Sequence, residues 1–139
     1  MRTLKLDDQT LRLETLFEDD FSKDTGLWLA EGTPLVKIEN GRLSMDAVTG
    51  DSHVSTVWCN REFEGDTVIE YTARIEPTLD AKGHGETNMN FFFYASDPSG
   101  KSLAETSKAR TGAYKEYHVL NNYILTYLNS DKNEKSPIH

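Results

Sequence analysis

Several features common in other classes of protein are missing from this chain of 139 residues. It has one cysteine, Cys59, so no intramolecular disulfide can form, and its apolar surroundings are typical of a small buried hydrophobe. Basic charge is scarce: the net charge of −8 argues against nucleic acid or an anionic membrane as the main partner. No apolar run is long enough for a transmembrane helix, and residues 1–8 lack the apolar core of a signal peptide. We therefore expect a cytoplasmic protein, or a secreted or periplasmic one from which a signal was removed.

Motifs of several enzyme classes are also missing. The histidines show no metal-ligand spacing, so we expect no cofactor, with a structural calcium ion in a loop as the open alternative. No phosphate-binding glycine loop and no Ser-His-Asp arrangement occurs. No strand-like segment carries the closely paired carboxylates that glycoside hydrolysis normally needs, which disfavours a standard retaining glucanase.

The sequence is instead rich in short β-strand patterns separated by turn signals. Asn40-Gly41 between two alternating segments is the strongest hairpin signal, residues 97–100 are typical of a turn, and only residues 102–108 favour a turn or two of helix. With 37% hydrophobic and 27% charged residues, the chain suits one folded core. We predict an all-β fold, a jelly-roll β-sandwich in one domain over residues 1–139, with 1–10 and 129–139 frayed or partner-dependent. The strand patterns cover residues 11–17, 36–39, 42–45, 54–59, 68–75, 87–95 and 122–128.

The most informative pattern is Thr-Asn-Met-Asn-Phe-Phe-Phe-Tyr-Ala at residues 87–95. Strand side chains alternate between two faces. One face then receives a polar and aromatic row, and the other an apolar row suited to a core: Asn88, Asn90, Phe92 and Tyr94 against Met89, Phe91 and Phe93. Amides pair with vicinal hydroxyls and rings stack on the C–H faces of sugars, so the first row indicates a concave carbohydrate-binding surface. The alternative is a half-buried strand with a polar outer face.

Two other strand patterns carry candidate residues. Trp58 shares a face with Thr56 and Asn60, which suits either a sugar-stacking platform or the core. In residues 68–75, Glu70 and Arg74 share a face, so Glu70 would act as acid or base and Arg74 would bind a uronate carboxylate. The alternative is a solvated strand face whose charges neutralise each other.

Residues 109–122 form a predicted loop with a third set of candidates. His118 with Tyr114 or Tyr117 would supply the acid/base pair of a lyase that abstracts a proton beside a uronate carboxylate. Arg110, or the amides of Asn88 and Asn90, would neutralise that carboxylate. The alternative is a structural loop whose tyrosine hydroxyls satisfy backbone groups.

These segments carry a resemblance to known domains. Leu-Phe-Glu-Asp-Asp-Phe at residues 16–21, Trp28 and the hairpin at 38–43 resemble the opening of concanavalin A-like lectin/glucanase jelly rolls. Residues 111–118 with Asn121-Asn122-Tyr123 are similar to the YesU-like family of uncharacterised domains, whose closing strands would follow Leu128 and are lacking here. The resemblance implies a jelly roll linked to plant or algal polysaccharide use, such as that of rhamnogalacturonan. It implies no catalytic residue.

The sequence leaves two functions open. One is carbohydrate binding on the concave face. The other is a polysaccharide lyase or glycoside hydrolase acting on a uronate- or rhamnose-containing glycan, with His118, Tyr114 and Glu70 in the chemical roles. A fragment with neither activity is a third interpretation.

The sequence also predicts a second chain as partner. A sandwich without closing strands leaves an open edge, so we expect a homodimer in which residues 122–128 pair with a second copy. The rival is a chain that closes on itself with a short final strand.

Overall fold

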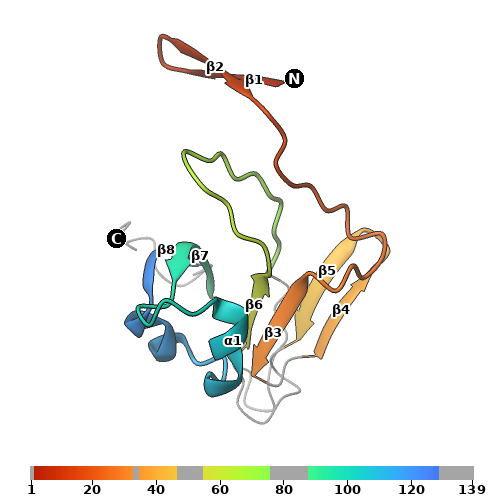
Figure 1. The fold of residues 1–139 in the computed structure, drawn as a ribbon. Coiled ribbons are helices and arrows are strands. Elements are labelled where there is room, and N and C mark those ends of the chain that lie inside the picture. The colour runs from red at the N-terminus through yellow and green to blue at the C-terminus, as the bar shows by residue number, and fades with distance from the viewer. Residues whose placement is uncertain (1, 33–34, 47–54, 76–87, 129–139) are drawn as a thin grey trace.

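Strands dominate the structure, a computed structural model that describes residues 2–32, 35–46, 55–75 and 88–128 (Figure 1). In these ranges eight strands form four antiparallel pairs, β1–β2, β3–β6, β4–β5 and β7–β8. The protein is therefore all-β in class, as the sequence predicts, and its described sheets are small and unclosed. The strands are β1 (Arg2–Leu6), β2 (Gln9–Leu13), β3 (Trp28–Gly32), β4 (Leu35–Glu39), β5 (Arg42–Asp46), β6 (Ser55–Cys59), β7 (Asn88–Ser96) and β8 (Asn121–Leu128).

The Asn40-Gly41 hairpin is confirmed as β4–β5. Asn40 and Gly41 both have positive φ, 54° and 73°, which is the backbone of a type I′ turn and matches the twist of the flanking strands. The Gly41 N–H donates to the carbonyl of Phe21 at 3.1 Å, so the turn is attached to the segment that precedes β3.

The first strand prediction, residues 11–17, is wrong in its second half. β2 ends at Leu13, and β1–β2 forms a hairpin that projects away from the other strands (Figure 1). Residues 14–27 contain no regular strand, and aspartate side chains accept from backbone N–H groups there: Asp19 from Phe21 at 2.8 Å and Asp20 from Ser22 at 2.9 Å. Asp19 also accepts from Nε1 of Trp28 at 2.9 Å. The bonds to Asp19 lower its pKa, and the bond from Trp28 has the largest effect.

The strand predicted at residues 68–75 does not form. The described chain from residue 60 to residue 75 has no strand, although it runs beside β7 and β8. Its contacts there are made by side chains, since Tyr71 stacks on Phe91 and bonds to Tyr127. The period-two pattern in this segment therefore lacks the backbone ladder that a strand requires.

Short helices fill the connection between β7 and β8. The turn at residues 97–100 and the expected turn of helix are confirmed: α1 (Leu103–Thr106) begins with a capping box between Ser102 and Glu105. The 3₁₀-helix η1 (Ser107–Ala109) follows. A second 3₁₀-helix, η2 (Tyr114–Val119), occupies part of the predicted loop at 109–122, and that part of the loop prediction is wrong.

The core lies where these helices meet β3, β6 and β7. Its buried members are Trp58, Tyr117 and Leu120, and Trp58 retains 8% of its surface exposed. Phe92 packs against this cluster, with its ring centroid 5.7 Å from that of Trp58 and 5.1 Å from that of Tyr117. Phe92 therefore faces the core, whereas the alternation of residues 87–95 assigned the core face to Met89, Phe91 and Phe93.

A buried ionic network attaches the helical connection to β3. Glu31 is 2% exposed, and its carboxylate accepts bonds from Nε of Arg110 at 2.9 and 3.0 Å and from the hydroxyl of Tyr117 at 2.7 Å. Arg110 also donates to the carbonyl of Leu103 and the hydroxyl of Thr106. The network thus joins β3 to α1, η1 and η2.

Gly112 permits the close approach that this network needs. Its φ is +89°, and a Cβ there would lie 2.9 Å from the carbonyl oxygen of Glu31 and 3.3 Å from Cα of Ser55. We expect Gly112→Ala to shift the backbone of β3 and of β6, which carry Glu31 and Ser55. The substitution should destabilise the protein by roughly 1–3 kcal/mol beyond the cost of a positive φ.

Gly100→Ala is the matched control for this prediction. Gly100 has a similar φ, +78°, with no described atom within 4 Å of its Cβ position, so its cost should be the backbone strain alone, about 1–2 kcal/mol. Urea unfolding of the two variants measures the difference. Equal losses of stability would show that the contact with Glu31 does not matter.

Candidate functional site

The face of the β7–β8 pair that points away from the core is lined by large apolar and aromatic side chains. The antiparallel register places Phe93 opposite Tyr123, Phe91 opposite Leu125, and Met89 opposite Tyr127. We call this surface the aromatic face. Its members are Met89, Phe91 and Phe93 of β7, Tyr123, Leu125 and Tyr127 of β8, and the adjoining Tyr71 and Tyr94.

The rings of the aromatic face are in continuous contact. Tyr71 stacks on Phe91 with centroids 4.8 Å apart, and Phe91 lies 5.9 Å from Phe93. Phe93 in turn stacks on Tyr123 at 5.5 Å. The result is a row of rings that crosses from the segment before β7, along β7, to β8.

Tyr94 belongs to this row and not to the row of amides assigned by alternation. A register shift between Phe93 and Ser96, together with the positive φ of Tyr94 (51°), breaks the period of two. The ring of Tyr94 lies edge-on to Tyr123 at 6.3 Å. Its hydroxyl donates to the carbonyl of Gly65.

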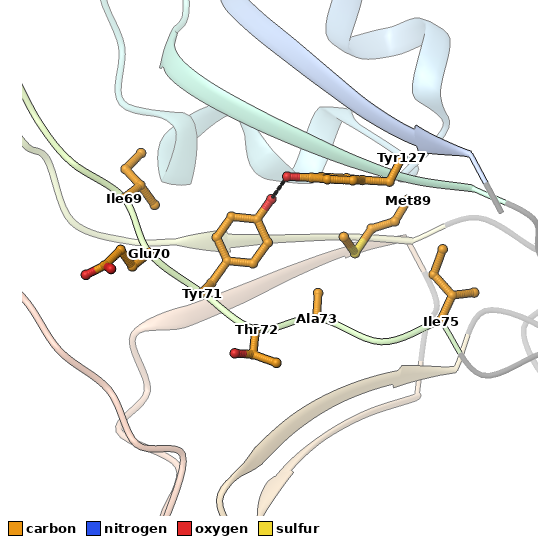
Figure 2. A pocket seen from close by; sticks show the side chains of 8 residues that line it. All are labelled: Ile69, Glu70, Tyr71, Thr72, Ala73, Ile75, Met89 and Tyr127. Carbon is orange, nitrogen blue, oxygen red and sulfur yellow. Dashed lines mark hydrogen bonds between the residues drawn. The ribbon is translucent and has the colours of Figure 1, made fainter. Parts of the chain in front are cut away.

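A groove of about 660 Å³ opens at one end of the aromatic face (Figure 2). Tyr71 and Tyr127 point toward each other across it, and the Tyr71 hydroxyl donates to the Tyr127 hydroxyl at 2.9 Å. The lining combines apolar walls with a few hydroxyl groups and one carboxylate. It consists of Ile69, Glu70, Tyr71, Thr72, Ala73, Ile75, Met89 and Tyr127.

Four tyrosines of the aromatic face are accessible to a ligand. Tyr71 is 44% exposed, Tyr94 56%, Tyr123 66% and Tyr127 41%. Burial of the Tyr71 phenol, and then its bond to Tyr127, raises the pKa of Tyr71 to about 12. The Tyr71 hydroxyl is therefore neutral at physiological pH and can donate and accept hydrogen bonds.

The opposite face of β7–β8 carries part of the predicted amide row. The hydroxyl of Thr126 donates to Oδ1 of Asn90 at 2.8 Å, so this amide is engaged across the strand pair. The side chain of Asn88 lies outside the described residues. Phe92, between Asn90 and the helices, belongs to the core.

The predicted acid/base residues separate into a surface pair and a buried tyrosine. Tyr114 and His118 are exposed on η2, with their rings edge-on at 4.7 Å. Tyr114 also lies 6.2 Å from Phe92, on the side of β7 that Asn90 shares. Tyr117 is fully buried, and burial raises the pKa of its hydroxyl far above the ordinary value.

The remaining predicted residues lie apart from one another. Trp58 is in the core and Arg110 is in the buried network with Glu31. Glu70 is exposed at the rim of the groove and forms an ion pair with Arg2 of β1. Arg74 is exposed two residues beyond Thr72. The site residues predicted from the sequence therefore do not converge. Trp58, Tyr117 and Arg110 belong to the core and its buried network, Glu70 to the rim of the groove, and Tyr114 and His118 to the surface of η2. Asn90 and Tyr94 lie on opposite faces of β7.

Tyr71, Tyr123 and Tyr127 were missed as site residues. A signal for two of them was present, because Tyr123, Leu125 and Tyr127 alternate in residues 122–128. Their pairing with Phe93, Phe91 and Met89 depends on strand register, which the sequence does not reveal.

No group of three or more His, Cys, Asp or Glu side chains in the described ranges is placed to hold a metal ion. Likewise, none of the helices described is long and apolar enough to cross a membrane.

Comparison with known proteins identifies a family. Residues 50–136, more than half of the chain, match the family described as Domain of unknown function (DUF6250). The chain belongs to this family. No curated protein and no solved structure matches the chain. The DUF6250 match includes β6, β7, the helical connection and β8, and therefore the whole aromatic face and its groove.

The bond between Tyr71 and Tyr127 gives a prediction for this DUF6250 site. In Tyr127→Phe the ring is kept but the acceptor hydroxyl is lost, so the pKa of Tyr71 should fall from about 12 part of the way to the ordinary 10.0, with burial holding the remainder. A pH titration of the tyrosine ring signals by NMR measures this value. Tyr123→Phe, which leaves the bond intact, should not change the pKa of Tyr71.

The same shift sets a dependence of stability on pH. Because the pKa of Tyr71 is higher in the folded than in the unfolded chain, its contribution is complete below pH 10 and is lost as the pH rises through about 12. In Tyr127→Phe this alkaline loss should still begin near pH 10, the pKa of the unfolded chain, but it should be smaller and end at a lower pH. An unchanged Tyr71 titration in Tyr127→Phe would contradict the assigned bond.

Proposed function

We propose that the protein binds carbohydrate, and that the aromatic face with its groove is the contact surface. The observation that carries this proposal is the continuous row of rings, in which Tyr71, Tyr123 and Tyr127 are exposed. Large exposed apolar patches on a folded protein mark interaction sites. A sugar ring offers a C–H face that packs on an aromatic ring and hydroxyl groups that bond to polar atoms at its edge.

The polar groups around the row suit such a ligand. The paired hydroxyls of Tyr71 and Tyr127 can each donate and accept, as sugar hydroxyls require. Thr72 and the carboxylate of Glu70 add further partners at the rim of the groove. Glu70 is the one charged residue among the described residues that line the groove, so the groove favours an uncharged part of a glycan over a carboxylate.

We further propose that the fold is a concanavalin A-like jelly roll similar to the YesU-like family, and that the ligand is a plant or algal polysaccharide or oligosaccharide. The antiparallel pairing of β3 with the distant β6, with the β4–β5 hairpin between them in sequence, supports a Greek-key type of connection. The resemblance of residues 16–21, Trp28 and residues 111–118 adds the carbohydrate context.

Glycan binding is tested by comparing two exposed tyrosines on different sides of the β7–β8 pair. Oligosaccharides that contain rhamnose or uronate are titrated against the protein by calorimetry. Tyr123→Ala should weaken binding about fivefold, because loss of one aromatic contact costs on the order of 1 kcal/mol. Tyr114→Ala is the matched control, since Tyr114 is also an exposed tyrosine but lies on η2, and it should leave the affinity unchanged.

A second candidate function is supported by one contact. His118 and Tyr114 touch on the surface of η2, which is the arrangement of an acid/base pair in a lyase or hydrolase for uronate- or rhamnose-containing glycans. Glu70, the third residue of this hypothesis, lies at the rim of the groove, where it pairs with Arg2.

An absorbance assay for unsaturated uronate products, run on the same glycans, separates the two functions. The proposal of binding predicts affinity without new absorbance. Turnover that disappears in His118→Ala, with glycan affinity retained, would establish the enzyme instead, because proton transfer acts mainly in the transition state. Loss of affinity in Tyr114→Ala but not in Tyr123→Ala would move the binding site to η2.

A further inference from the structure

The outer edge of β8 has no strand partner among the residues that the structure describes. Among the described residues β8 pairs only with β7, so one side of its backbone has no ladder partner. β7 is irregular near its end: its register with β8 shifts between Phe93 and Ser96, and the Tyr94 hydroxyl donates to the carbonyl of Gly65. Irregularities of this kind protect an edge from pairing, whereas β8 runs in register from Tyr123 to Leu128.

Nothing in the sequence of β8 protects its edge. Exposed edge strands usually carry lysine, another charge or proline, which prevents pairing with a second chain. The strand reads Asn-Asn-Tyr-Ile-Leu-Thr-Tyr-Leu, and β7 likewise has neither charge nor proline. Each of the pairs β1–β2, β3–β6 and β4–β5 contains at least one charged residue.

The distribution of charge determines which partner this edge suits. The chain has a net charge of −8, so two copies repel one another over most of their surfaces. At β8 that repulsion is weakest, while unpaired backbone groups and exposed Tyr123, Leu125 and Tyr127 offer attraction. A strand without charge is also complementary to itself, which a two-fold interface requires.

We infer that a second copy of this chain pairs with β8, strand to strand and antiparallel, to give a four-stranded sheet in the order β7-β8-β8-β7. The eight residues of β8 span roughly 27 Å at 3.4 Å per residue. Exposed Tyr123, Leu125 and Tyr127 supply on the order of 300 Å² of side-chain surface per copy, in addition to the backbone edge. The total of about 600 Å² of side-chain surface is below the range of standard specific interfaces, so we expect a weak dimer that depends on the backbone ladder and dissociates in the micromolar range.

The symmetry of this dimer has a consequence for the aromatic face. Two identical antiparallel edge strands are related by a two-fold axis perpendicular to the sheet, and such an axis leaves both aromatic faces on the same side. The two rows of rings therefore form one surface, which would contact a glycan longer than a single copy reaches. This consequence rests on the proposed carbohydrate binding, but the dimer itself does not.

Sedimentation or light scattering of the ligand-free protein tests the dimer. The wild-type chain should change from monomer to dimer with rising micromolar concentration. Leu125→Lys places two like charges close to the two-fold axis and should raise the dissociation constant at least about 30-fold, as loss of an interface hot spot does. Val119→Lys, a lysine on an exposed apolar residue of η2, is the matched control and should leave dimerisation unchanged.

Hydrogen exchange of wild-type β8 amides gives an independent measurement if Leu125→Lys fails to fold. Half of these amides, those that point to the open edge, should gain protection as concentration rises. A monomer at all concentrations would overturn the inference, as would a dimer that Leu125→Lys does not weaken. Protection of all β8 amides in dilute protein would also overturn it, because the edge would then be covered within one chain. None of these results depends on carbohydrate binding.

Discussion

The buried carboxylate of Glu31 is the interaction that fixes the arrangement of the site. A carboxylate removed from water is costly unless it is paired and hydrogen-bonded, and Glu31 has both kinds of partner. Arg110 and Tyr117 reach it from the connection between β7 and β8. The bond to Glu31 raises the pKa of Arg110, so this charge persists at any physiological pH. Removal of one member would leave the others buried without compensation, which makes the network an anchor for α1, η1 and η2.

This anchor determines which face of β7–β8 is available to a ligand. With Tyr117 fixed on Glu31, its ring packs on Trp58 and Phe92, and the core forms on that side of β7. Phe91, Phe93, Tyr123 and Tyr127 then point to the other side, where Tyr71 covers only part of the row. The aromatic face is thus a consequence of a core built on the opposite side, and its open groove is where a ligand would replace solvent.

Local signals in the sequence predicted much of the fold. The Asn40-Gly41 turn, the strands β6, β7 and β8, and the capped turn at Ser102 each follow from adjacent residues. Residues 68–75 failed because alternation shows that side chains face two ways but not that a neighbouring strand exists. No local pattern indicates that Glu31 is buried, because its burial depends on Arg110, which is 79 residues away.

The sequence analysis placed the candidate surface on the right strand, β7, but on its other face, the one that carries Asn90. Residues 87–95 were identified as the sheet that a ligand would contact, but the core took Phe92, and the bulge moved Tyr94 to the other row. Trp58, Tyr117 and Arg110 have side chains that serve equally in binding sites and in cores, and only long-range contacts distinguish the two uses. Tyr123 and Tyr127 could not be assigned for the same reason, because their partners on β7 are set by the strand register, which is a long-range property.

Binding of a glycan to the aromatic face is tested most directly by NMR of the tyrosine ring protons during titration with an oligosaccharide. The exposed and buried tyrosines report on separate sides of β7–β8. We expect the ring signals of Tyr71, Tyr123 and Tyr127 to shift with a common binding curve, while those of buried Tyr117 and of Tyr114 on η2 do not. Shifts confined to Tyr114 and His118, with Tyr71, Tyr123 and Tyr127 unchanged, would contradict binding at the aromatic face.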